Sequence, residues 1–158
     1  MNQSVSESPS SDSPARVLAA PRLAAAVLAA WTLFVWSNRI TNVLNDDGLE
    51  GWAMTWRLAV AVVFVVLALA SAFAAAASRL GSPGAASSLP TWGTGAVSAL
   101  AMASILWWPP RTVSTLVADF SVAFKVVHVV LAVVSVGLGV WALRTVRAGS
   151  SRFLAAKG

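Results

Sequence analysis

The stretch from Trp56 to Ser78 reads WRLAVAVVFVVLALASAFAAAAS and contains a single charged residue, Arg57, at its second position. A helix of about 20 apolar residues crosses roughly 30 Å of hydrocarbon, since each residue adds about 1.5 Å. Three further stretches have the same character: Val17 to Ser37, Pro90 to Trp108 and Phe120 to Leu143. A soluble domain of this length does not require four such segments. The sequence therefore predicts an all-α integral membrane protein with four transmembrane helices.

Around these stretches the chain divides into three parts. Residues 1–15 are rich in Ser and have few apolar side chains, so they are predicted to form a disordered cytoplasmic tail. Residues 16–143 form the transmembrane domain, and residues 145–158 form a basic tail. A signal peptide is the alternative for the first apolar stretch, but its apolar region would span only about 7 to 15 residues. An uncleaved transmembrane helix is therefore favoured.

Composition excludes several kinds of chemistry. The chain is 58% hydrophobic and 11% charged, and it has no Cys, so it contains no disulfide, no thiolate metal site and no Cys nucleophile. The net charge of +5 reflects few acids and an Arg-rich C-terminal tail. A nucleic-acid interface would need a basic face with stacking aromatics, so no nucleic-acid partner is expected.

The distribution of positive charge predicts the orientation, because short cytoplasmic loops collect Lys and Arg. If the N-terminus is inside, seven positive residues are cytoplasmic and four lie outside. The cytoplasmic set is Arg16, Arg22, Arg79, Arg144, Arg147, Arg152 and Lys157, and the outer set is Arg39, Arg57, Arg111 and Lys125. Frequent Arg, Ala and Val are also typical of GC-rich bacterial genomes. We expect a multi-pass protein of a bacterial plasma membrane with both termini cytoplasmic.

Tryptophan is concentrated at the predicted outer boundary of the membrane. An indole ring is amphipathic and sits well between acyl chains and headgroups. The predicted interface anchors are Trp36, Trp52, Trp56, Trp107 and Trp108. The alternative is an aromatic ligand site, and the lipid-interface belt is favoured.

An internal repeat relates the two halves of the chain. A shift of 72 residues superposes Trp36 on Trp108, Arg39 on Arg111, Leu44 on Leu116 and Asp47 on Asp119. A shift of 64 residues superposes Leu67-Ala-Leu-Ala-Ser71 on Leu131-Ala-Val-Val-Ser135. The pattern predicts two tandem hairpins, about residues 17–79 and 90–144, related by a pseudo-twofold axis along the membrane normal.

The repeat also predicts a structural charge cluster. Arg39, Asp47, Arg111 and Asp119 take equivalent positions just outside the first and third spans. Arg39 and Asp47 are eight residues apart, about 12 Å along one helix, which is long for direct pairing. We therefore expect Arg39 to pair with Asp119 and Arg111 to pair with Asp47, fixing how the hairpins dock.

Each outer connection carries a helical pattern of its own. Apolar residues recur at three- and four-residue steps, which predicts short amphipathic helices along the outer interface. They are Ile40, Val43 and Leu44 in the first connection, and Val113, Leu116, Val117, Phe120 and Phe124 in the second. The turn signal Asn45-Asp46-Asp47-Gly48 ends the first of these helices. Pro109-Pro110 is expected to interrupt the helical backbone before the second one starts. A cation site at Asp46, Asp47 and Glu50 is the alternative to a solvated acidic loop.

Two groups of residues resemble a known family. One group is Trp31 and Trp36 followed by Asn42-Val43 and Asp46-Asp47, and the other is His128 with Leu131-Ala-Val-Val-Ser135. Together they resemble small actinobacterial membrane proteins of about one helical hairpin, whose function is uncharacterised. The resemblance covers one hairpin at a time, and Phe64 stands in the first where His128 stands in the second. It implies fused hairpins and no particular reaction.

Polar groups inside the predicted spans are few. No Asp, Glu, Lys or Arg lies at the centre of a span, so ion-coupled transport is disfavoured. His128 near the outer end of the last span is the exception. A structural hydrogen bond across a helix pair is favoured for it, and the alternatives are a pH switch or a haem ligand completed by a partner chain or by Met102. No nucleophile, base and orienting acid can be assembled around this one His, so we expect no enzyme, no metal and no cofactor.

Small residues in the spans predict close helix packing. They form Ala-rich faces near residues 24–30 and 68–77, and Gly137 and Gly139 do the same in the last span. The leading hypothesis is a non-enzymatic accessory, scaffold or assembly subunit that contacts another membrane protein or itself. The alternative is a small transporter, channel or lipid-binding protein, which would need a polar cavity between the repeats. A cofactor-bearing anchor that uses His128 is third.

Overall fold

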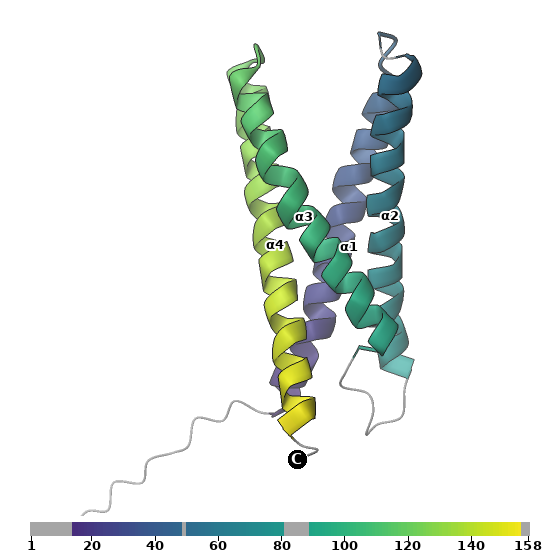
Figure 1. Cartoon of the computed structure of the whole chain (residues 1–158), viewed down its shortest axis with the longest axis vertical. Coiled ribbons are helices and arrows are strands. Elements are labelled where there is room, and N and C mark those ends of the chain that lie inside the picture. The colour runs from purple at the N-terminus through teal and green to yellow at the C-terminus, as the bar shows by residue number, and fades with distance from the viewer. Residues whose placement is uncertain (1–13, 49, 81–88, 156–158) are drawn as a thin grey trace, which may run out of the picture.

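Four long helices account for nearly all of the chain that the structure describes. The structure is a computed structural model, which describes residues 14–48, 50–80 and 89–155. The helices are α1 (Pro14–Leu44), α2 (Gly51–Leu80), α3 (Thr91–Val117) and α4 (Val122–Ala155) (Figure 1). Residues 1–13 of the predicted tail lie outside the described residues, whereas Pro14 and Ala15 already belong to α1. At the other end, α4 continues as a helix into the predicted basic tail.

The first hairpin turns where the sequence predicts it. Helix α1 ends at Leu44, immediately before Asn45-Asp46-Asp47-Gly48. The Asp46 side-chain oxygen Oδ1 accepts a hydrogen bond from the Gly48 amide at 3.2 Å, which is the local bond that favours Asp in turns. Gly51 then starts α2 with a φ of 58°, a left-handed conformation that Gly adopts without steric cost.

The two hairpins form a V. Helix α1 packs against α2 and α3 packs against α4, while α2 also contacts α3 and α1 also contacts α4. Figure 1 shows the hairpins meeting at the end where α1 begins and α4 finishes, and diverging toward the connections that join α1 to α2 and α3 to α4. We call these the narrow end and the wide end. Both chain ends of the helical body therefore lie on the same side.

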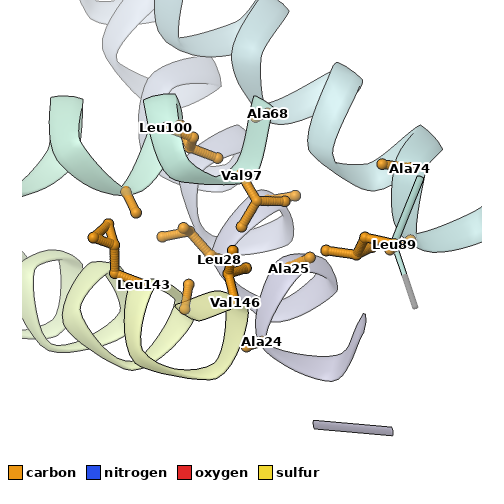
Figure 2. Packing of buried hydrophobic residues seen from close by; sticks show 14 of the residues in the cluster. Ala24, Ala25, Leu28, Ala68, Ala74, Leu89, Val97, Leu100, Leu143 and Val146 are labelled. Carbon is orange, nitrogen blue, oxygen red and sulfur yellow. The ribbon is translucent and has the colours of Figure 1, made fainter. Parts of the chain in front are cut away.

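Toward the narrow end, the core is built from small residues, as the sequence predicts. Ala24, Ala25 and Ala29 of α1 and Ala68 and Ala74 of α2 are fully buried. Small side chains let backbones approach closely where lipid removes the hydrophobic drive between helices. Figure 2 shows larger side chains filling the centre, with Leu28 of α1 among Val97, Leu143 and Val146. Bulky aromatic side chains replace these alanines toward the wide end, and the hairpins separate there.

The predicted interfacial helices are not separate elements. Residues 40–44 continue α1 without interruption, and Val113 and Leu116 belong to α3. The expected break at Pro109-Pro110 is wrong, because α3 runs through both prolines. Just after the prolines, the hydroxyl groups of Thr112 and Thr115 donate hydrogen bonds to the Trp108 and Arg111 carbonyls, at 2.8 and 2.9 Å.

Three helical segments are long and apolar enough to cross a membrane: Ala20–Leu44, Gly51–Arg79 and Val122–Gly149. Helix α3 does not qualify, because Thr, Gly, Ser, Trp and Pro lower its hydropathy. Large apolar side chains also cover the outward faces of α2 and α4, among them Val62, Val66, Phe73, Val126 and Val133. These findings support a membrane location for the chain and leave the predicted fourth span unconfirmed.

One buried hydrogen bond connects the two hairpins below the wide end. The indole Nε1–H of Trp31 in α1 donates to Ser135 Oγ in α4 at 2.9 Å. The equivalent Ser71 instead donates to the Leu67 carbonyl of its own helix at 2.8 Å. The first bond joins helices, whereas the second is local.

Replacing Ser135 by Ala is therefore expected to destabilise the detergent-solubilised protein by about 0.6 to 1.7 kcal/mol, because the Trp31 N–H loses its acceptor. Ser71→Ala is the matched control and should change the unfolding free energy much less. Chemical unfolding in mixed detergent measures both. Equal effects of the two variants would show that the interhelical bond adds nothing.

Candidate ligand cleft between the hairpins

The diverging hairpins leave two hollows at the wide end. The large hollow has a volume of about 730 Å³ and lies mainly between α1 and α4. Its lining residues include Phe34, Val35, Asn38, Asn42, Ala123, Val127 and Leu131. The small hollow has a volume of about 330 Å³ and lies between the first hairpin and α3. Its lining residues include Trp36, Trp56, Val60, Trp107 and Ser114.

Three arginines line both hollows. They are Arg39 of α1, Arg57 of α2 and Arg111 of α3. Arg39 and Arg111 are half-buried, and Arg57 is exposed. Arg57 and Arg111 lie close enough to act electrostatically on Arg39. The cleft is therefore divided by a cluster of three positive charges, which we call the arginine cluster.

Aromatic rings form the floor beneath the arginine cluster. The rings of Trp36 and Phe64 stack with centroids 4.3 Å apart. The centroid of the Trp107 ring lies 6.2 Å from the centroid of each of these rings. The Arg39 guanidinium lies 5.6 Å from the Trp36 ring centroid, a cation–π geometry. The floor is aromatic, and the Trp36 ring lies against the Arg39 guanidinium.

His128 lies in the wall of the large hollow on α4. Its Nδ1 is 3.0 Å from the Phe124 carbonyl oxygen, which can only accept, so Nδ1 carries the proton and donates. The Phe124 ring packs against the imidazole with centroids 4.1 Å apart. This hydrogen bond stays within α4 and does not reach a neighbouring helix. Met102 is exposed on α3 and does not line the cleft.

The predicted charge cluster is only half assembled. Arg39 and Arg111 come together in the cleft, and Asp47 and Asp119 lie exposed near the hairpin turns. Within residues 14–48, 50–80 and 89–155, neither arginine forms an ion pair with these acids. Asp46 is the acid that lines the large hollow, and its Oδ1 accepts from the Gly48 amide. The arginine cluster thus keeps excess positive charge.

The five predicted Trp anchors fall into two groups. Trp52 and Trp56 are 77% and 50% exposed, as an interface anchor would be. Trp36 and Trp108 are only 2% exposed, and Trp107 is partly buried in the floor. These three do not face the surroundings as the belt prediction requires, because the same amphipathic ring also packs well between helices. The alternative of an aromatic cluster beside a ligand site describes Trp36 and Trp107 better.

Sequence reasoning missed the part that Arg57 takes in the cleft. It lies six residues after the start of α2, while Arg39 lies five residues before the end of α1 and Arg111 six before the end of α3. Similar distances from the wide end place all three near one level of the bundle. The sequence pattern predicts a break at Pro109-Pro110, before Arg111, so this match could not be found from it.

Histidine and carboxylate side chains do not gather in the described part of the chain. No group of three or more of them lies close enough to hold a metal ion there. The loop acids Asp46, Asp47 and Glu50 are exposed.

Comparisons with protein-family models, with curated proteins and with solved structures find no match for this chain. The resemblance to the hairpin family therefore stays a prediction.

Proposed function

We propose that this chain is a non-enzymatic, multi-pass membrane protein that holds an amphiphilic molecule between its two hairpins. The cleft between the hairpins carries this proposal, since a cavity between the repeats is the feature that a lipid-binding protein needs. Apolar side chains such as Phe34, Val127 and Leu131 line the large hollow together with polar Asn38 and Asn42. A cleft with mostly apolar walls and a few convergent polar groups is a typical ligand site.

The gradient of polarity suits an amphiphile. Leu131 lies deeper in the bundle than His128, and Asn42 lies nearer the wide end than Asn38 and Arg39. Acyl chains would contact the deeper apolar lining, and a headgroup would meet the polar groups near the membrane surface. A lipid can enter sideways, because the hollow lies between two helices and is not enclosed by a loop.

The proposal includes the membrane topology. All four helices cross the bilayer, with α3 stabilised by its contacts to α2 and α4 in spite of its lower hydropathy. The wide end lies outside, and both termini lie in the cytoplasm of a bacterial cell. The positive residues support this assignment, because among the described residues six lie toward the narrow end and four toward the wide end. The narrow-end set is Arg16, Arg22, Arg79, Arg144, Arg147 and Arg152, and the wide-end set is Arg39, Arg57, Arg111 and Lys125.

Single cysteines test the topology, because the natural chain has none. Asp47→Cys and Ala118→Cys, beside the two wide-end turns, should react with an impermeant thiol reagent in intact cells. Gly149→Cys, near the end of α4, should react only after the cells are opened. Labelling of Gly149→Cys in sealed cells, or protection of both turn positions, would overturn the assignment.

Filling the cleft tests the proposed function. Ala123 lines the large hollow, and its exposed neighbour Val122 does not. Ala123→Trp should abolish retention of lipid by the protein in native mass spectrometry from a mild detergent, and Val122→Trp should keep it. Equal retention by both variants, or no retained lipid in the unmodified protein, would contradict the proposal. A stoichiometric protein partner instead of lipid would favour the accessory-subunit hypothesis, and a Soret absorbance would favour a cofactor at His128.

A further inference from the structure

The arginine cluster is an unusual arrangement for the interior of a membrane protein. Arg39, Arg57 and Arg111 come from three different helices and meet at one level of the bundle. Like charges at short range repel, and the repulsion grows as water is excluded. In the described residues no carboxylate lies in ion-pair contact with any of the three. The fold thus brings three cations together, and Asp46, the acid in the lining of the large hollow, forms no ion pair with them.

Two hydrogen-bond donors beside the cluster also lack partners. Arg111 Nε and Trp107 Nε1 are shielded from solvent and have no acceptor in the structure. Both residues line the small hollow. A buried donor without an acceptor is destabilising, because its desolvation is not offset by a hydrogen bond. Excess charge and unsatisfied donors at the same place indicate a site for a group that brings negative charge and several acceptor oxygens.

We propose that Arg39, Arg57 and Arg111 bind a phosphate group, which is either the headgroup of an anionic phospholipid or a soluble phosphate. This inference rests on the proposed function, because the cluster lies in the same cleft as the amphiphile. Guanidinium groups present planar pairs of donors that match phosphate oxygens in bidentate contacts. A carboxylate has two oxygens and can satisfy fewer of the donors that approach from three helices.

The surroundings give each arginine a different role. Arg39 is held in place by the Trp36 ring beneath it, so its donors are oriented before the ligand arrives. Arg57 is the exposed member, and it meets a phosphate that enters from the membrane surface. Arg111 closes the site from the second hairpin. A phosphate in this position bridges the two hairpins through their equivalent residues Arg39 and Arg111 and offsets the repulsion between them.

The test compares two lipids with identical acyl chains on the delipidated protein in a non-ionic detergent. Dioleoylphosphatidylglycerol should bind at least about tenfold more tightly than dioleoylglycerol, which lacks the phosphate, as measured by native mass spectrometry and by the shift in melting temperature. Arg57→Gln and Arg111→Gln should each weaken phosphatidylglycerol binding by about tenfold or more and leave dioleoylglycerol unchanged. Arg79→Gln, an exposed arginine at the other end of α2, is the matched control and should bind both lipids normally.

Inorganic phosphate, titrated against chloride at equal ionic strength, separates the two sources. If phosphate raises the melting temperature and displaces phosphatidylglycerol, a soluble phosphate can occupy the site. If only the lipid binds, the headgroup is the source. Equal affinity for the two lipids, with no effect of inorganic phosphate, would overturn the phosphate site and leave the amphiphile cleft standing. Binding of inorganic phosphate without binding of either lipid would support the phosphate site and contradict the amphiphile cleft. The lipid comparison on the unmodified protein decides the question even if a variant fails to fold.

Discussion

Gly93→Ala is expected to destabilise the folded bundle by about 1–3 kcal/mol, the usual cost of overpacking a close-packed site. Gly93 is buried near the start of α3, at the contact with α2. A Cβ at this position would overlap the Cβ of Ala74, which is itself fully buried. It would also lie 3.2 Å from the Pro90 ring, so neither neighbour can move away easily. The α2–α3 contact would have to open.

Gly95→Ala is the matched control, two residues further along the same helix. A Cβ at Gly95 meets nothing within 4 Å. Because Ala favours a helix over Gly by about 1 kcal/mol, this variant should be as stable as the natural chain or slightly more so. Unfolding by sodium dodecyl sulfate in mixed micelles, followed by circular dichroism, measures both variants. If Gly93→Ala is as stable as Gly95→Ala, the helices do not pack as closely as the structure has them.

Trp36→Ala is expected to destabilise the protein by about 3 kcal/mol, at the low end for replacing a buried aromatic residue by Ala. The low end applies because lipid, unlike water, solvates the exposed apolar surface well. Trp36 is almost fully buried, stacks on Phe64 and supports Arg39. The variant should lose packing in the cleft floor and the orientation of Arg39 together. Trp36→Phe should recover a large part of the stability.

Trp52→Ala provides the comparison for this prediction, because Trp52 is 77% exposed at the start of α2. Its removal should leave the unfolding free energy nearly unchanged in detergent. The same unfolding titration measures both variants. If both variants lose the same unfolding free energy, Trp36 does not support the cleft floor. It would then be an interface anchor, as the sequence pattern predicts.

Sequence patterns predicted the parts of this fold that depend on local chemistry. The turn at Asn45-Asp46-Asp47-Gly48, the Ala-rich contacts and the pairing of helices into hairpins all follow from residue type and spacing. The repeat also has equivalent environments, since Trp36 and Trp108 are both buried, and Arg39 and Arg111 both line the cleft. A true duplication of one ancestral hairpin stays a prediction.

Features that depend on packing between helices could not be predicted in the same way. An amphipathic Trp fits a lipid interface and a helix contact equally well, so its burial is decided by neighbours such as Phe64. Pro109-Pro110 would break an isolated helix, but α3 continues through both prolines in the packed bundle. The meeting of Arg57 with Arg39 and Arg111 depends on the levels at which three helices end. Pairwise patterns along the chain do not contain that information.

The V shape gives the molecule unequal rigidity along its length. At the narrow end, side chains such as those of Ala24 and Ala68 have no rotatable groups, so their contacts can be lost but cannot adapt. At the wide end, hollows lie between the hairpins, and the exposed side chain of Arg57 can change rotamer. The wide end is therefore expected to deform more easily than the narrow end.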